Sequence, residues 1–176
     1  MKTTILLITG ACGSGKSYFV PILKDRLAGF KVRVHDFDEK ISMTNEAAVD
    51  LFLTLSEDYN KNGFFTIICG GILPHEIKAS KNYSSDKFII DCCLLNVEEV
   101  ERRKRLLLRN ENFFLLTNPC KLPLEEWFQC IYNSAKKYNE LIKNADFYIE
   151  IDNTSNFNEN TINSVCSWIK SRIGEK

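Results

Sequence analysis

The stretch that decides the fold is Gly-Ala-Cys-Gly-Ser-Gly-Lys-Ser at residues 10–17, directly after the apolar run Ile-Leu-Leu-Ile at residues 5–8. It matches the phosphate-binding pattern G-x-x-x-x-G-K-[ST] at every specified position. A chain that wraps a polyphosphate turns its N–H groups inward through conformations that a Cβ hinders, and Gly10, Gly13 and Gly15 avoid this hindrance. The segment therefore predicts a strand, a nucleotide-binding loop and a helix, in that order. The alternative is a Gly-rich strand-to-helix turn that binds nothing.

The side chains of this loop predict its chemistry. The Lys16 ammonium is expected to bind the β and γ phosphates and to act in catalysis, and the Ser17 hydroxyl is expected to bind Mg²⁺. The following helix directs the positive end of its dipole at the same anion. The residues expected to contact the nucleotide are Gly10, Cys12, Gly13, Ser14, Gly15, Lys16, Ser17, Tyr18 and, from a distant turn, Thr154.

Composition narrows the class of protein. With 176 residues, 44% of them hydrophobic, the chain is expected to form a single domain over residues 1–176. Acidic and basic residues are equal in number, 23 each, so no overall field favours nucleic acid or a membrane as partner. The run at residues 5–8 is too short to span a bilayer, and export is not expected.

The cysteines predict a reducing environment. There are seven, none in a C-x-x-C pair, and only two histidines accompany them, so no zinc pattern is present. We therefore expect mostly buried thiols in a cytoplasmic protein. Cys12 is the exception, because its place in the loop makes a lowered thiol pKa plausible.

Strand-like and helical patterns alternate along the chain, which indicates an α/β protein with a parallel sheet covered on both faces. The expected strands cover residues 4–8, 31–35, 64–69, 87–94 and 147–151. The expected helices cover residues 17–28, 44–62, a short piece from residue 74, a segment carrying residues 102–109, and residues 124–144 and 158–172. Asn96 and Glu99 look like a capping pair for the fourth helix. Residues 81–86 and 110–121 are expected to be loops.

Two carboxylates follow the second expected strand, and ligands gather at this end of parallel strands. We assign Asp36 to Mg²⁺ and Asp38 to the acceptor hydroxyl, where it binds substrate and accepts a proton, although the two roles are interchangeable on sequence. An ordinary acidic turn is the alternative. His35 is expected to be structural.

Gly70 and Gly71 end the third expected strand, where an ATPase of the motor or transporter type would show Asp-Glu. Paired glycines let the backbone approach a ligand closely, so both are expected to line a substrate pocket. A plain turn is the alternative.

A basic cluster covers residues 102–109. Arg105 and Arg109 lie four residues apart and are expected on one helix face, where they would stabilise charge on a transferred phosphoryl group as catalytic residues. Arg102, Arg103 and Lys104 are expected to be solvated. Residues 110–121 would then close as a short lid that excludes water. Thr154 belongs to a polar turn that either borders the adenine or simply caps the last helix.

Taken together, the loop, the Asp36–Asp38 pair, the glycines and the Arg105–Arg109 segment resemble the P-loop small-molecule kinases, a group that includes shikimate, gluconate and nucleoside kinases. The resemblance covers nearly the whole chain. It implies a three-layer P-loop NTPase fold with a five-stranded parallel sheet of order 2-3-1-4-5, helices on both faces, ATP and Mg²⁺ as cofactors, an arginine-bearing lid, and an acceptor pocket above the second and third strands.

One departure from that family concerns the acceptor. Residues 34–101 contain no arginine, although relatives that accept anionic substrates use arginine there. Lysines in this segment offer only point charges. We therefore expect ATP-dependent phosphorylation of a small, non-anionic hydroxyl compound such as a nucleoside, sugar, polyol or aminated compound. A polynucleotide 5′-hydroxyl kinase and a non-catalytic nucleotide-binding regulatory protein remain as alternatives.

Overall fold

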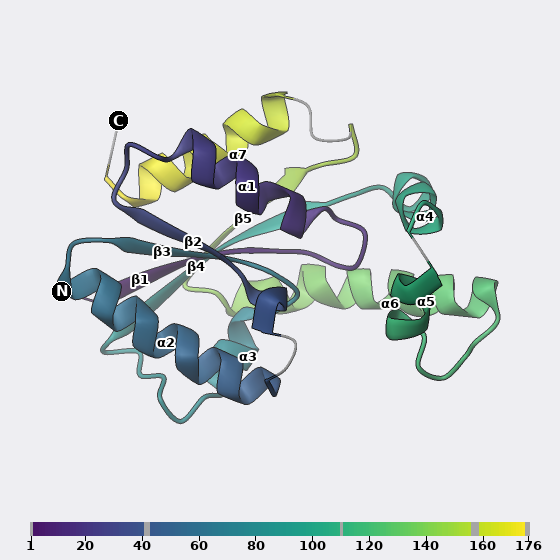
Figure 1. The fold of residues 1–176 in the computed structure, drawn as a ribbon, viewed down its shortest axis with the longest axis horizontal. Helices are drawn as coiled ribbons and strands as arrows, with labels where there is room; N and C mark the ends of the chain where they lie inside the picture. Colours follow the sequence, from purple (N-terminus) through teal and green to yellow (C-terminus); the bar gives the residue numbers. More distant parts are fainter. Residues whose placement is uncertain (1, 41–42, 110, 156–158, 175–176) are drawn as a thin grey trace.

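The computed structural model describes residues 2–40, 43–109, 111–155 and 159–174. Its centre is a five-stranded parallel sheet of order β2-β3-β1-β4-β5, which confirms the predicted topology (Figure 1). The strands are β1 (Thr3–Thr9), β2 (Val32–Asp36), β3 (Phe65–Cys69), β4 (Phe88–Asn96) and β5 (Phe147–Asp152). In register, Ile8 of the central strand lies between Cys69 and Cys93.

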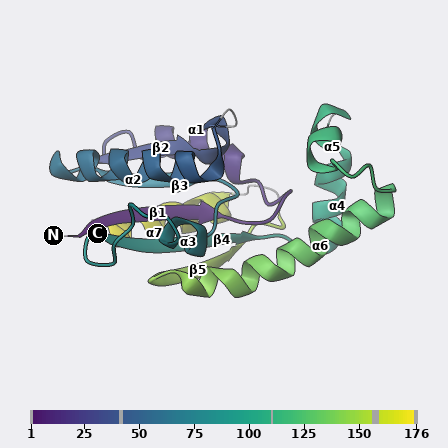
Figure 2. The same cartoon turned by 90° about the horizontal axis from the view of Figure 1, so that it is seen from below.

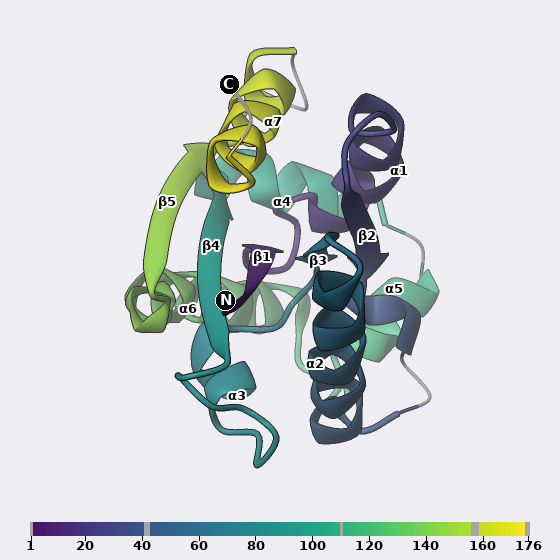
Figure 3. The same cartoon turned by 90° about the vertical axis from the view of Figure 1, so that its left-hand side faces the viewer.

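Helices cover both faces of the sheet, as predicted. Helices α1 (Lys16–Arg26) and α7 (Glu159–Arg172) lie on one face, and α2 (Asn45–Lys61), α3 (Pro74–Lys78) and α6 (Leu124–Leu141) lie on the other (Figure 3). The remaining helices are α4 (Glu99–Leu107), α5 (Glu111–Thr117) and the short 3₁₀ turns η1 (Phe37–Lys40) and η2 (Ile142–Asn144). No helix in the described ranges is both long and apolar enough to cross a bilayer.

Strand β1 supplies side chains to two separate cores. Leu6 and Ile8 pack in the cluster beneath α1 and α7, whereas Ile5 and Leu7 pack in the cluster beneath α2. Successive strand side chains point to opposite faces, so a central strand covered on both sides must be apolar throughout. This is why residues 5–8 form an unbroken apolar run.

A third, smaller core forms the lobe, by which we mean α4, α5 and the N-terminal part of α6, which project beyond the sheet (Figures 1 and 2). Leu106, Trp127, Phe128 and Ile131 are buried there. Cys12 of the loop between β1 and α1 packs against this core. The lobe therefore rests directly on the predicted phosphate loop.

The expectation that residues 110–121 form only a loop is wrong, because α5 occupies Glu111–Thr117. Phe114 packs edge-on against Trp127, with 5.0 Å between ring centroids. The Trp127 indole also donates a hydrogen bond to the Thr117 carbonyl at 3.1 Å. These contacts with α6 stabilise a helix too short to be stable alone.

Helix boundaries agree elsewhere with small exceptions. Thr44 caps α2 by accepting the Ala47 N–H at 3.2 Å. The predicted capping pair of α4 is wrong, since the Asn96 side chain accepts the N–H of Val97, and Glu98 is the N-cap residue. Residue 158, where the last helix was expected to begin, lies outside the described residues.

Candidate active site

The loop between β1 and α1 has the backbone that a phosphate site requires. Gly13 and Gly15 adopt φ of 83° and 93°, in the left-handed region that glycine tolerates. Gly10 is needed for space instead, because a Cβ there would lie 2.6 Å from the Leu95 carbonyl oxygen. Gly15 is the N-cap of α1, so the N-terminus of that helix opens at the loop.

Lys16 carries a positive charge that the described part of the chain does not neutralise. Its Nζ donates to the Ala11 carbonyl at 3.2 Å, and it forms no ion pair with any described residue. Burial lowers the pKa of Lys16, and the neighbouring charges of Asp38 and Asp36 raise it in part. A desolvated ammonium without a bound carboxylate is suited to an anionic ligand.

Asp36 and Ser17 meet at the end of β2, as the metal assignment requires. The Asp36 carboxylate accepts the Asp38 N–H at 3.0 Å and is hydrogen-bonded by the Ser17 hydroxyl. Burial raises the pKa of Asp36, and both hydrogen bonds oppose that shift. Asp38 lies close enough to Lys16 to act on its charge. The structure thus brings Lys16, Ser17, Asp36 and Asp38 into one site.

The same donors fit Mg²⁺. A hydroxyl and a carboxylate are the oxygen ligands it prefers, and it normally keeps several waters and phosphate oxygens. Within the described ranges no group of three or more His, Cys, Asp or Glu residues forms a metal site. A site with few protein ligands, completed by phosphate and water, is what Ser17 and Asp36 can provide.

Arg102 contradicts its expected solvation. The residue is 3% exposed, and its guanidinium donates to the Val97 carbonyl at 2.8 Å and the Cys12 carbonyl at 3.5 Å. Its Cγ would lie 3.0 Å from a Cβ at Gly13. Arg102 therefore braces the phosphate loop from the lobe. The sequence signal was its spacing from Leu106, four residues later on the buried face of α4.

We expect Arg102→Met to destabilise the protein by about 1–3 kcal/mol, because it leaves the buried Val97 carbonyl without its donor. Denaturant unfolding measures the loss, and calorimetric titration of ATP should show weaker binding. Lys104→Met is the matched control, since this exposed lysine makes only a 3.9 Å ion pair with Glu101. Equal unfolding midpoints for the two variants would contradict the bracing role.

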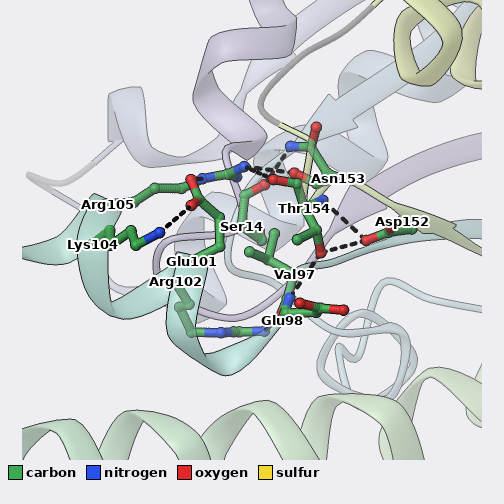
Figure 4. Close-up of polar contacts among 10 residues, drawn as sticks. All are labelled: Ser14, Val97, Glu98, Glu101, Arg102, Lys104, Arg105, Asp152, Asn153 and Thr154. Atoms are coloured by element: carbon green, nitrogen blue, oxygen red, sulfur yellow. Dashed lines mark hydrogen bonds and ion pairs between the residues drawn. The ribbon is translucent and has the colours of Figure 1, made fainter.

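Arg105 and Arg109 do not share a helix face, which corrects the predicted pair. Helix α4 ends at Leu107, so Arg109 lies beyond it. Arg105 binds the carbonyls of Asn153 and Thr154 at 2.6 and 3.2 Å and is paired with Glu101 (Figure 4). These contacts fasten α4 to the turn after β5 and direct the Arg105 guanidinium to that turn.

That turn also reaches the phosphate loop. The Asn153 amide donates to the Ser14 carbonyl at 2.9 Å, and the Thr154 hydroxyl accepts the Glu98 N–H at 2.9 Å (Figure 4). Thr154 therefore lies next to the loop, as its assignment to the nucleotide requires. Asn153 was missed, because an amide in a polar turn gives no sequence signal of a partner 139 residues away.

Arg109 remains the candidate for charge stabilisation from the lobe. Its guanidinium carbon lies 5.2 Å from the Phe113 ring centroid, a cation–π contact. Its charge also acts on Cys12. Burial nevertheless raises the pKa of the Cys12 thiol, so the lowered pKa considered from sequence is wrong. Tyr18 is 53% exposed at the start of α1.

Gly70 is not positioned to bind substrate. Its N–H donates to the Ile8 carbonyl at 3.0 Å, and a Cβ there would lie 2.3 Å from that of Phe37. The close approach is to the protein's own η1 turn rather than to a ligand. Gly71 is exposed and lines a pocket of about 230 Å³, where its carbonyl accepts the Tyr138 hydroxyl at 2.6 Å. His35 stacks on Tyr59 within the fold.

We expect Gly70→Ala to destabilise the protein by about 1–3 kcal/mol through overpacking against Phe37. Gly29→Ala is the control, because a Cβ there has no neighbour within 4 Å among described residues. Its effect should stay within about 0.5 kcal/mol. Thermal or urea unfolding compares the two. An unchanged Gly70→Ala midpoint would show that η1 can move away.

No protein-family model and no curated protein matches the sequence. Solved structures do match over nearly the whole chain. A sugar kinase from Janibacter sp. HTCC2649 has 14% identity and a TM-score of 0.61, covering 97% of this chain and 95% of its own. Shikimate kinase from Acinetobacter baumannii has 18% identity and a TM-score of 0.50, with 98% and 93% coverage.

A third similar structure is a tRNA isopentenylpyrophosphate transferase from Bacillus halodurans, with 12% identity, a TM-score of 0.53, and coverage of 98% of this chain and 97% of its own. At these identities the likeness extends to the fold. The chain has the P-loop small-molecule kinase fold, which confirms the resemblance expected from its motifs.

Proposed function

We propose that the protein is a kinase that transfers the γ-phosphoryl group of ATP to a hydroxyl group of a small, non-anionic compound. The observation that carries this proposal is the convergence of Lys16, Ser17, Asp36 and Asp38 at the ends of β1 and β2. A half-buried ammonium without an ion pair among the described residues, a pair of oxygen ligands for Mg²⁺ and a second carboxylate are the groups that phosphoryl transfer uses.

In the proposed reaction, the loop N–H groups and the Lys16 ammonium hold the β and γ phosphates. A Mg²⁺ ion at this site would supply positive charge that offsets the charge developing on the phosphates. The Ser17 hydroxyl and the Asp36 carboxylate would hold that ion. Asp38 orients the acceptor hydroxyl and accepts its proton as the oxygen bonds to phosphorus. The bond from that phosphorus to the β–γ bridging oxygen breaks, and ADP leaves.

The lobe supplies the remaining groups. Arg102 stabilises the conformation of the phosphate loop through its hydrogen bond to the Cys12 carbonyl. Arg109, whose charge acts on Cys12, would offset negative charge on the transferred group. We propose that residues 110–121 act as a lid within this lobe and exclude water, which would otherwise accept the phosphoryl group. Thr154 and the turn after β5 would border the adenine. The proposed setting is a cytoplasmic protein without nucleic-acid or membrane partners.

The test is ADP release in the presence of ATP and Mg²⁺, with a panel of nucleosides, sugars, polyols and amino alcohols. We expect release that depends on one acceptor class. Stimulation by 5′-hydroxyl oligonucleotides would favour a polynucleotide kinase instead. Tight ATP binding with no transfer to any compound would favour a non-catalytic nucleotide-binding protein.

A further inference from the structure

A pocket of about 310 Å³ lies between the first turn of α2 and helix α3. Its residues are Asn45, Glu46, Val49, Ile72, Glu76, Ala79 and Ser80. This volume is near the lower end of the range for ligand pockets, which is roughly 300–1,000 Å³. It suits a small metabolite with an apolar part and a polar part. In the sequence, the η1 turn that carries Asp38 comes before α2, which supplies Asn45, Glu46 and Val49 to this pocket.

The charged side chains of this pocket are both acidic. Neither Glu46 nor Glu76 forms an ion pair with a described residue, although Glu76 accepts the Leu73 N–H at 2.7 Å. Lys78, on the same helix as Glu76, is paired instead with Asp146 at 3.0 Å. Two carboxylates without a counter-charge favour a cationic ligand over a neutral or anionic one.

A third carboxylate lies directly behind the pocket lining. The Ser80 hydroxyl donates to Asp50 at 2.5 Å and accepts the Asn82 N–H at 3.0 Å. The Ser80 proton is therefore already used, and Ser80 has no donor to offer an anion. The described ionisable groups in or directly behind this lining are Glu46, Glu76 and Asp50, and all three add to its negative potential.

Glu76 joins this pocket to the proposed reaction centre. It also lines the second pocket, with Gly71 and Tyr138. Burial, followed by the charges of Glu76 and Asp38, raises the pKa of Tyr138 to about 12. Both carboxylates therefore lie within electrostatic reach of one phenol. The second pocket is also lined by His75 and Lys137, so its charge is mixed and the first pocket is the more negative.

We propose that the acceptor is a small hydroxylated amine whose ammonium group is held by Glu46 and Glu76, with its hydroxyl directed toward Asp38. This inference rests on the proposed kinase function and narrows its substrate to a cation. Amines with a hydroxyl a few bonds away, such as amino sugars and amino alcohols, have this chemistry. The absence of arginine from residues 34–101 agrees with it.

Calorimetric titration, with and without ADP, tests the pocket using matched probes: glucosamine against glucose, and 2-amino-1,3-propanediol against glycerol. We expect saturable binding of at least one amine and binding of its neutral partner at least tenfold weaker. Glu46→Gln, at an exposed position, should weaken amine binding by roughly tenfold to a hundredfold, as expected for loss of a charged hydrogen-bond partner. Glucose and glycerol binding should not change.

Glu57→Gln is the matched control, because it removes a carboxylate from the other end of α2, where Glu57 is 3.6 Å from Lys87. It should leave amine binding unaltered. Equal binding of amines and neutral partners, no amine binding, or unaltered amine binding by Glu46→Gln would overturn the cation site, even if neutral alcohols are phosphorylated. Amine binding without phosphoryl transfer from ATP would instead support the cation site and overturn the kinase proposal.

Discussion

Replacing Asp38 with Asn is expected to lower turnover by roughly a hundredfold or more while ATP binding stays nearly intact. The amide keeps the size of the side chain but cannot accept the proton of the acceptor hydroxyl. Asp38 acts on Lys16 through its charge, whereas the hydrogen bond of Lys16 goes to the Ala11 carbonyl. Replacing Asp38 should therefore leave the phosphate loop undisturbed. Acceptor-dependent ADP release gives the turnover, and calorimetry gives the ATP affinity.

Two further variants help to interpret the result for Asp38→Asn. Asp25→Asn, on the exposed side of α1, should match the unmodified protein. Asp36→Asn should raise the Mg²⁺ concentration needed for half-maximal turnover, because it removes a proposed metal ligand, whereas Asp38→Asn should not. If Asp38→Asn turns over normally, the proton-accepting role is wrong. If Asp38→Asn alone shifts the Mg²⁺ dependence, the two aspartates have exchanged roles.

Replacing Lys16 with Met is expected to reduce phosphoryl transfer below detection and to weaken ATP binding. Lys16 is the one cation among residues 10–17, so no neighbouring residue of that segment can replace its ammonium. The same assay of ADP release measures the transfer. Calorimetric titration of ATP measures the affinity.

Stability separates this effect from misfolding. Because Lys16 is desolvated in the folded protein, Lys16→Met should keep or raise the unfolding temperature. Lys24→Met, an exposed substitution on the same helix, should leave both activity and stability unchanged. A lower unfolding temperature for Lys16→Met would show that the ammonium stabilises the loop. Normal transfer would remove the basis of the proposed function.

The sequence predicted the parts of the fold whose signals are local. The apolar run at residues 5–8 predicts a buried strand, and the glycines of the loop predict backbone conformations that other residues avoid. The structure confirms the buried strand and the positive φ angles of Gly13 and Gly15. The sequence of the lobe predicted its structure less well, because helix α5 was expected to be a loop. Helix α5 forms because Phe114 meets Trp127, a contact between segments that periodicity cannot connect.

In the candidate site, too, some predicted positions agree with the structure and others do not. Ser17 and Asp36 were placed together correctly, because parallel strands bring their carboxyl ends to one edge. Gly70 and Arg105 were misassigned, since each has a partner far along the chain: Phe37 for the glycine, and the turn at Asn153 for the arginine. Arg102 was expected in solvent, yet it lies under the loop.

The sequence by itself determined the alternation of strands and helices, the phosphate loop and the residue types around it, because hydrophobic periodicity and the steric needs of glycine act over short distances. The sheet order was implied only by the resemblance to the P-loop small-molecule kinases, and the structure confirms it. Only the tertiary structure decided which arginine contacts the phosphate loop, which one binds the turn after β5, and which carboxylates share a pocket with no ion pair to a described residue. Those outcomes depend on where a long side chain finds its partner, and packing between distant segments sets that distance.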